Sequence, residues 1–361
     1  MKRNSKLVFM TGGGTAGHIF PNLALADELK KDGIACEYLG RPYGIEAGIV
    51  KETGMPFHNM NSGRLHRSFD LDLLRTPIRM GVGVFQGIYH ILKHRPGAIF
   101  CKGGFMSWPA AVAGWLTYTP VILHESDLTP GLANKLCAPF ANRLCVTFPE
   151  TLKHLPEGKA VYTGTPIRES LTQGSREKGF ELTGLDPKGK PVLMVVGGSL
   201  GAGALNDAVD QYFDLLMEHF QILHLYGSYS DYEVKHHAKG YFPLQFAKDE
   251  LPDLFAMTDL VLSRAGSNAI NEFLLLKMPN VLVPLPTENS RGDQILNAEQ
   301  FEAQGFSYLL RQEDITEESL MKALETVYTN RDRYRKAMDI KAKNGTKEVA
   351  RIIKKQLKKS E

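Results

Sequence analysis

One local pattern occurs twice in this chain of 361 residues and constrains its fold more than any other feature. A short apolar run leads into a glycine-rich turn and then into a segment with helical spacing of apolar residues. The first copy reads KLVFM-TGGGTAGH-IFPNLALADELKK from Lys6, and the second reads PVLMVV-GGSLGAG-ALNDAVDQYFDLL from Pro191. A buried strand, a tight turn and a helix are the unit from which parallel α/β sheets are built.

Further apolar runs alternate with helical patterns in both halves of the chain. The predicted strands are ACEYLG, AIFCKGG, PVILHES and RLCVTF in the first half, and FQILHLYG, DLVLSRAG and NVLVPLP in the second. The turn-rich segments TGTPIRESLTQG and GLDPKGKP lie between the halves and predict a hinge. We therefore predict the α/β class, with two Rossmann-like, doubly wound parallel sheets whose loops face each other across a cleft.

Composition excludes several classes of protein. With 43% hydrophobic and 23% charged residues the chain is typical of a globular enzyme rather than a disordered protein. A net charge of +3 is too weak to indicate nucleic-acid binding. The four cysteines contain no CxxC pair, so we expect small buried thiols in a reducing compartment. No apolar run reaches the roughly 18 residues of a membrane span.

The first glycine turn has the spacing Gly12-x-Gly14-x-x-Gly17, which is typical of dinucleotide-binding loops. Such loops are followed about 20 residues later by an acid for the ribose, and Glu37 stands there. Glu37 falls inside a predicted strand, however, so we expect it to point sideways. A nicotinamide site and a purely structural turn stay open as alternatives, but we favour a loop that faces a phosphate, because a helix start offers N–H groups and a positive dipole end.

His18 follows this turn directly. The positive potential at a helix N-terminus favours the neutral imidazole, which can accept a proton from a hydroxyl group. The alternative is a histidine that only caps the turn.

Seven motifs follow one another along the chain: GGGTAGHIFPNLALADEL, KGGFMSWPA, LHESDLTPGLANK, GTPIR, GGSLGA, SRAGSNAINE and DQILNA. Together they resemble the MurG-type UDP-N-acetylglucosamine transferases of glycosyltransferase family 28. Members of that family transfer N-acetylglucosamine from UDP-GlcNAc to lipid I, an undecaprenyl-diphosphate-linked muramoyl-pentapeptide, and form lipid II in peptidoglycan synthesis.

The resemblance implies a GT-B fold that works without a cofactor or a metal. We expect an acceptor domain of residues 1–164, joined by a final helix near 346–361, and a UDP-sugar domain of residues 165–345. The implied partners are UDP-GlcNAc, lipid I and an anionic membrane surface, with no nucleic acid. The implied location is peripheral, on the cytoplasmic face of the plasma membrane.

The resemblance also implies the residues of the donor site. The start of the helix in SRAGSNAINE is expected to donate to the diphosphate through the backbone of Gly266, Ser267, Asn268 and Ala269. Glu272, one turn further on, is expected to accept both ribose hydroxyls, since a carboxylate accepts two donors at once. The other residues implied to bind UDP-GlcNAc are Thr15, Gly17, Arg168, Ser199, Phe246, Ala247, Asp293, Gln294 and Asn297.

The implied reaction is an inverting transfer in which the acceptor 4-hydroxyl attacks the anomeric carbon while UDP leaves. A base must take the proton of that hydroxyl. His18 is the first candidate, and Glu125 and Asp127 are the others. The acceptor diphosphate is expected to lie against Gly13, Gly14, Thr15 and Gly104.

Three positions depart from the family pattern. Asp127 stands where many relatives have Asn, Phe105 replaces a common tyrosine, and Leu200 replaces a frequent glutamine. The departures leave the identity of the base open. They also keep open a non-catalytic sensor of sugar nucleotides.

The segment RLHRSFDLDLLRTPIRMGVGVFQGIYHILKHR, residues 64–95, combines an apolar face with many cations. Basic groups and an apolar patch both favour an anionic membrane surface, so we predict peripheral attachment here through Arg75, Arg79, Lys93 and Arg95. An ordinary core helix is the alternative. The pair Asp70-x-Asp72 has the form of a metal-binding DxD motif, which we attribute to chance.

Three rival functions share parts of this pattern. A transferase for another lipid acceptor and a UDP-GlcNAc 2-epimerase share the implied fold, and LHESD supplies the acids that an epimerase would need. A nicotinamide-dependent oxidoreductase would use the first glycine loop differently.

Overall fold

The computed structural model describes residues 3–63, 71–227, 232–289, 291–341 and 343–358, without the side chains of residues 71–75 and 289. The chain forms two compact units. Unit 1 comprises Met1–Arg168 and Asn344–Glu361, and unit 2 comprises Glu169–Lys343. The chain thus passes from unit 1 to unit 2 after Arg168 and returns after Lys343.

Unit 1 is built on a parallel sheet of seven strands in the order β3-β2-β1-β4-β5-β6-β7. The strands are β1 (Asn4–Thr11), β2 (Ala35–Gly40), β3 (Phe57–Asn59), β4 (Pro96–Cys101), β5 (Val121–Glu125), β6 (Arg143–Val146) and β7 (Ala160–Tyr162). The helices are α1 (Phe20–Lys31), α2 (Ile45–Glu52), α3 (Leu71–His94), α4 (Ser107–Leu116), α5 (Leu132–Cys137) and α14 (Thr346–Lys358), with 3-10 turns η1 (Ala16–His18), η2 (Ala138–Phe140) and η3 (Pro149–His154).

Unit 2 repeats this plan with six parallel strands in the order β10-β9-β8-β11-β12-β13. The strands are β8 (Val192–Val196), β9 (Gln221–Leu225), β10 (Tyr241–Leu244), β11 (Leu260–Ser263), β12 (Asn280–Leu282) and β13 (Tyr308–Leu309). The helices are α6 (Arg176–Thr183), α7 (Gly203–Gln211), α8 (Phe213–His219), α9 (Leu251–Met257), α10 (Ser267–Leu276), α11 (Asp293–Ala303), α12 (Glu317–Thr329) and α13 (Arg331–Asp339), with 3-10 turns η4 (Glu169–Thr172), η5 (Thr287–Asn289) and η6 (Gln312–Asp314).

Both units confirm the predicted class of two Rossmann-like parallel sheets. In each sheet the chain builds strands outward to one edge and then returns to the middle, so that β4 lies beside β1 and β11 lies beside β8. Every strand predicted from an apolar run is present. The edge strands β3, β7, β10 and β13 were not predicted, because each has two to four residues and no long apolar run.

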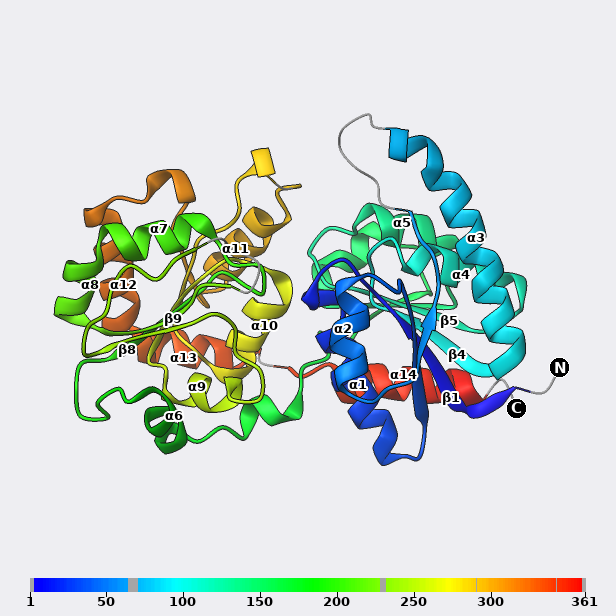
Figure 1. The fold of residues 1–361 in the computed structure, drawn as a ribbon, viewed down its shortest axis with the longest axis horizontal. Coiled ribbons are helices and arrows are strands. Elements are labelled where there is room, and N and C mark those ends of the chain that lie inside the picture. The colour runs from blue at the N-terminus through cyan, green and yellow to red at the C-terminus, as the bar shows by residue number, and fades with distance from the viewer. Residues whose placement is uncertain (1–2, 64–70, 228–231, 290, 342, 359–361) are drawn as a thin grey trace. The chain divides into compact units, whose positions relative to one another are not determined.

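The sheet of unit 1 is buried on both faces. Val8 and Met10 of β1 pack in one cluster with α1 and α14, whereas Leu7 and Phe9 pack in a second cluster with α3 and α4. Figure 1 shows α14, in red, running beside α1 within this unit. The alternation of side chains along β1 therefore serves two cores at once, which is why its sequence is continuously apolar.

Hydrogen bonds fix the return of the chain to unit 1. The amide of Gly345 donates to the carbonyl of Thr165 over 2.9 Å, and the amide of Ile167 donates to Oγ1 of Thr346 over 2.9 Å. A Cβ on Gly345 would lie 2.5 Å from the carbonyl group of Gly164, so only glycine allows this approach. Helix α14 begins at Thr346, directly after this junction.

Replacing Ile353 with alanine tests how strongly α14 stabilises unit 1. The side chain is fully buried against α1 and the sheet, so Ile353→Ala should lower the free energy of unfolding by about 2–5 kcal/mol. Both tryptophans of the chain, Trp108 and Trp115, lie on α4 of unit 1, so urea unfolding followed by tryptophan fluorescence reports on this unit. The same substitution at Ile78, which is 70% exposed on α3 of unit 1, should change the free energy of unfolding by less than about 0.5 kcal/mol. Equal effects of the two substitutions would contradict this packing.

Candidate functional site

The two glycine turns lie at equivalent positions in their own sheets. β1 ends at Thr11 beside Cys101, the last residue of β4, and β8 ends at Val196 beside Ser263, the last residue of β11. Each pair marks the point where the order of strands reverses. In open parallel sheets this point is where loops separate and ligands bind.

His18 lies at the turn of unit 1, in η1. Its Nδ1 atom lies 2.9 Å from the carbonyl oxygen of Gly13 and 3.4 Å from Oγ1 of Thr15. Because a carbonyl oxygen can only accept, Nδ1 of the neutral ring carries the hydrogen and Nε2 keeps the lone pair. The fold thus orients His18 as a proton acceptor through Nε2.

The loop between β4 and α4 packs directly on this histidine. A Cβ on Gly104 would lie 2.6 Å from the carbonyl oxygen of Gly13 and 3.4 Å from Nδ1 of His18, and Gly104 has a φ of 75°. Both the close approach and the left-handed backbone require glycine here. Oγ of Ser107 donates to the carbonyl of Gly103 and accepts from its amide, which fixes this loop. The structure therefore brings predicted residues Gly13, Gly104 and His18 together.

Glu125 is the last residue of β5, the next strand in the sheet, and Asp127 follows in the loop after it. Glu125 is buried, and its oxygens accept from the amides of Asp127 and Gly131 over 3.0 and 2.9 Å and from Nδ2 of Asn134 over 2.8 Å. These bonds fold the loop after β5 around the Glu125 carboxylate. Asp127 is half-buried in the same loop.

Lys102, which sequence reasoning missed, is the buried cation of this site. Its ammonium donates to Oγ of Ser126. Burial lowers the pKa of Lys102 from 10.5 to about 8, while the negative charges of Glu125 and Asp127 act in the opposite direction. The signal in the sequence was a lysine placed between an apolar run and two glycines.

In unit 2 the predicted donor residues 266–272 lie in the loop between β11 and α10 and in the start of α10, and this loop is the counterpart of the loop between β4 and α4. Gly266 precedes the first residue of α10, Ser267, and forms no side-chain cap, as expected of a residue without a side chain. Ser267 is buried, Gly266, Asn268 and Ala269 are half-buried, and Glu272 is half-buried one turn further along α10. Ser199, half-buried in the turn after β8, lies in the neighbouring loop of the same sheet.

Buried side chains hold the loop before α10 in place. Arg264, which the sequence did not indicate, is buried and donates to the carbonyls of Val283 and Pro284 over 3.1 and 3.3 Å and to Oε1 of Gln312 over 2.7 Å. Burial lowers the pKa of Arg264. Asn297 is fully buried, and its Nδ2 donates to the carbonyl of Ala265 over 3.3 Å.

Other predicted donor residues have internal partners as well. Oε1 of Gln294 accepts from the amide of Leu285 over 3.0 Å, and Asp293 pairs with Arg291 over 3.2 Å. Phe246 is half-buried and Ala247 is buried just after β10. Leu200 is 52% exposed in the turn after β8.

Arg168 is the last residue of unit 1 before the chain enters unit 2. Its guanidinium lies 5.0 Å from the centroid of the Phe20 ring, at the start of α1. A guanidinium over an aromatic face is favourable, so this contact fixes Arg168 beside the first glycine turn. In this structure Arg168 thus contacts unit 1, which also carries Thr15 and Gly17 of the predicted donor set.

Glu37 is not part of this site. Its Oε2 atom lies 2.6 Å from Nε2 of His58, on the neighbouring strand β3, and it stands three residues before the end of β2. An acid that binds a ribose belongs at the carboxyl end of that strand. The sideways orientation expected from the sequence is confirmed. Of the DxD pair, Asp70 lies outside the described residues, as does the side chain of Asp72.

Comparison with known proteins decides the family. The model of the glycosyltransferase family 28 N-terminal domain matches residues 8–146, and that of the C-terminal domain matches residues 192–356. The chain belongs to glycosyltransferase family 28.

Individual relatives agree with this family. A Clostridium botulinum (strain Langeland) protein named UDP-N-acetylglucosamine–N-acetylmuramyl-(pentapeptide) pyrophosphoryl-undecaprenol N-acetylglucosamine transferase is 46% identical, with 98% of this chain and 100% of that protein covered. A Bacillus cereus (strain ATCC 14579) protein of the same name, numbered 2, is 46% identical over 96% of this chain and 98% of its own. The crystal structure of Acinetobacter baumannii MurG matches with a TM-score of 0.73 and 26% identity, covering 97% and 99% of the two chains.

These matches confirm the resemblance seen in the sequence and the GT-B type of fold. They extend across both glycine turns of this family 28 transferase. Lys102, Arg264 and the other loop-supporting side chains are therefore part of a glycosyltransferase scaffold.

Replacing Lys102 with methionine tests the buried charge. Between about pH 8 and 10.5 the unfolded chain binds more protons at this lysine than the folded chain, so the stability of the wild type rises with pH across this window. The cost of burying the ammonium is present below the window and amounts to roughly 3 kcal/mol at about 1.4 kcal/mol per pKa unit. The free energy of unfolding of the wild type, relative to that of Lys102→Met, should therefore rise by this amount as the pH increases through the window.

The measurement is urea unfolding followed by tryptophan fluorescence at several pH values. Methionine in place of the exposed Lys153 is the matched control, and should follow the wild type at every pH. A wild type and a Lys102→Met variant with parallel pH dependence would contradict a buried cation at this position.

Proposed function

We propose that this chain transfers N-acetylglucosamine from UDP-GlcNAc to the muramoyl 4-hydroxyl of lipid I and forms lipid II. The observation that carries the proposal is 46% identity, over nearly the whole chain, to proteins named for this transfer. Two glycine turns at the reversal points of two parallel sheets fit a reaction with two pyrophosphates, one in the donor and one in the acceptor.

Unit 2 binds the donor in this proposal. The first turn of α10, from Gly266 to Ala269, directs backbone N–H groups and the positive end of the helix dipole at the diphosphate of UDP. Glu272 accepts from the ribose hydroxyls and Phe246 and Ala247 present backbone to the uracil. Negative charge grows on the leaving diphosphate, and these fixed dipoles stabilise it without the help of a metal.

The support for this assignment is the rigidity of the loop. Arg264 and Asn297 bond the backbone around residues 265 and 283, so the N–H groups are preorganised before the nucleotide binds. We assign Asn297 and Gln294 first to positioning, because each already bonds a backbone group. Ser199 approaches the diphosphate from the turn after β8, and Arg168, from the end of unit 1, supplies a positive charge.

Unit 1 binds the acceptor. Gly13, Gly14, Thr15 and Gly104 surround the lipid-linked diphosphate. His18 takes the proton of the 4-hydroxyl on Nε2 as the oxygen bonds to the anomeric carbon of the sugar. The bond from that carbon to the diphosphate breaks, and UDP leaves with the electron pair. This step requires the sugar held by unit 2 to reach the hydroxyl held by unit 1.

The other acids have different roles in this proposal. Glu125 accepts two hydrogen bonds from its own loop and one from Asn134 of α5, which suits a positioning residue better than a base. Asp127 is the second candidate for the base. Lys102, buried close to both acids, holds the loops after β4 and β5 together and adds positive charge near the acceptor diphosphate.

The experiment that tests the proposal is turnover with a lipid I analogue and UDP-GlcNAc. UDP should be released in proportion to the disaccharide lipid formed, and EDTA should leave the rate unchanged. Hydrolysis or epimerisation of UDP-GlcNAc without disaccharide would favour the epimerase, and UDP binding without turnover would favour a sensor. Thermal stabilisation by NADH but not by UDP would favour the oxidoreductase.

His18→Ala tests the base. Turnover should fall by about 100-fold or more, as expected when a general base is lost, while the affinity for UDP should stay unchanged because unit 2 is intact. The measurements are the initial rate with the lipid I analogue and calorimetric titration with UDP. Asp127→Asn is the parallel variant, and a larger loss there than in His18→Ala would transfer the role to Asp127.

We also propose that helix α3 attaches the protein to an anionic membrane surface. Ile78, Val82, Phe85, Tyr89 and Leu92 follow one another at intervals of four and three residues, so they share one face of α3, and 42–74% of each is exposed. The opposite face packs on α4, where a Cβ on Gly87 would lie 2.9 Å from the Cβ of Ala113.

An exposed apolar stripe beside cations is what a lipid surface stabilises. Arg79 and Lys93 are exposed on the same helix. Within the described parts of the chain, no helix is both long and apolar enough to span a bilayer. We propose that this attachment is to the membrane surface, on the cytoplasmic face where lipid I would be modified.

The double variant Ile78→Ser/Phe85→Ser tests this attachment. It should strongly reduce flotation with anionic vesicles, since two exposed apolar side chains of α3 are lost, and replacing Arg75, Arg79, Lys93 and Arg95 with serine should do the same. Leu182→Ser, at a leucine 53% exposed in unit 2, is the matched control and should float like the wild type. Unchanged flotation of both α3 variants would reject the assignment.

A further inference from the structure

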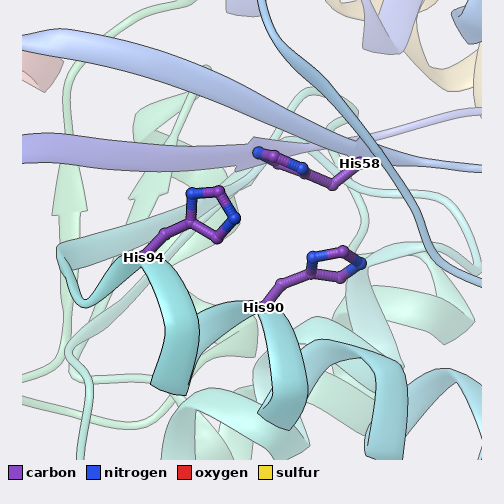
Figure 2. Close-up of side chains that lie close together, drawn as sticks. All are labelled: His58, His90 and His94. Carbon is purple, nitrogen blue, oxygen red and sulfur yellow. The ribbon is translucent and has the colours of Figure 1, made fainter.

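Three histidines gather on the α3 side of the sheet of unit 1. His58 lies on β3, and His90 and His94 lie one turn apart near the end of α3. Each ring offers a nitrogen within 4.8 Å of the others, and Figure 2 shows a nitrogen of each ring facing the space between the rings. All three side chains are half-buried. No residue of the proposed transfer site belongs to this cluster.

The outer nitrogens of these rings already face acceptors. Nε2 of His58 lies 2.6 Å and Nδ1 of His94 lies 3.3 Å from the same oxygen, Oε2 of Glu37. Nε2 of His90 lies 3.1 Å from the carbonyl oxygen of Asn59. Carboxylates and carbonyls only accept, so the outer nitrogens of His58 and His90 carry hydrogens. The 3.3 Å contact of His94 with Glu37 is not a hydrogen bond, but it favours the tautomer of the neutral ring with its hydrogen on Nδ1.

The inner nitrogens of neutral rings are then lone pairs. These are Nδ1 of His58, Nδ1 of His90 and Nε2 of His94. Nδ1 of His90 is buried and has no hydrogen-bond partner among the described residues. A buried lone pair without a partner costs free energy unless something binds it.

Phe9 of β1 closes one side of the cluster, with its ring centroid 5.6 Å from that of His58 and 5.8 Å from that of His94. The space is thus lined by imidazole lone pairs and an apolar ring.

We propose that His58, His90 and His94 bind one Zn²⁺ ion through these inner nitrogens. Three imidazoles leave a fourth position for water, and the outer N–H groups bonded to Glu37 and Asn59 are the second layer of contacts that orients histidine ligands in zinc sites. Zn–N bonds of about 2.1 Å place tetrahedral ligands about 3.4 Å apart, so the rings draw together by about 1 Å when the ion binds.

The ion would act as a clamp rather than as a catalyst of glycosyl transfer. It joins the last turns of α3 to β3, and through Glu37 to β2, and so fixes the helix that we assign to the membrane. The cluster lies on the α3 face of the sheet beside β2 and β3, and none of its residues belongs to a glycine turn.

The test is binding of Zn²⁺ to the full-length chain after dialysis against EDTA. Competition with a chromophoric chelator should give one ion per chain, and Co²⁺ should give the visible d–d absorption of a tetrahedral site with nitrogen ligands. His90→Ala and His94→Ala should each weaken Zn²⁺ binding by more than 100-fold, whereas Glu37→Gln should weaken it by about 10–100-fold. Mg²⁺ should not compete.

His154→Ala, at an exposed histidine of unit 1, is the matched control and should bind Zn²⁺ like the wild type. Circular dichroism of each metal-free variant checks that it folds. The Co²⁺ spectrum of the wild type tests the geometry of the site without any substitution. Absence of stoichiometric Zn²⁺ binding, an octahedral Co²⁺ spectrum, or equal affinity in folded His90→Ala and His154→Ala would overturn the proposal.

Discussion

Backbone N–H groups at the start of a helix that follows a buried parallel strand are the feature on which this structure depends. Such groups have no partner within the helix, and the helix dipole adds positive potential where they point. The chain places this arrangement before α10, at the reversal point of the sheet of unit 2, whereas at the reversal point of unit 1 the glycine turn Gly12–Gly17 presents loop backbone. In our proposal these two stretches of backbone bind the two pyrophosphates of the reaction.

The side chains around these turns serve mainly to hold them. Glu125 gathers the amides of its own loop, Arg264 joins the loop after β11 to that after β12, and Asn297 bonds the same loop from α11. Each is buried, so losing one would leave unpaired polar groups and a displaced loop. In this arrangement the backbone faces the ligand and buried side chains hold the backbone in place. It is consistent with catalysis by preorganised dipoles, for which rigid support of the loops matters more than a large number of charged contacts with the substrate.

The sequence allowed the central strands and both glycine turns to be predicted, because long apolar runs next to glycine have few other interpretations. Short edge strands such as β3 and β13 lack such runs, and their pairing depends on the rest of the sheet. The role of Lys102 was missed because the fold buries it and places it near Glu125 and Asp127, which lie 23 and 25 residues later in the chain.

The histidine cluster shows the same limit. The spacing of His90 and His94 is visible in the sequence, since residues four apart share a helix face. His58 and Glu37 join them only because β3 and β2 lie beneath the end of α3. Motifs that combine local and distant residues need the fold before they can be recognised. Motifs carried by one continuous turn, such as that containing His18, do not.

A crystal structure of the protein with UDP-GlcNAc tests most directly whether the backbone at the start of α10 binds the donor diphosphate. The diphosphate should lie against the amides of Gly266–Ala269, with the ribose at Glu272 and the turn at Gly12–Gly17 left for the acceptor. A nucleotide diphosphate seated on the turn after β1, with α10 unoccupied, would contradict it.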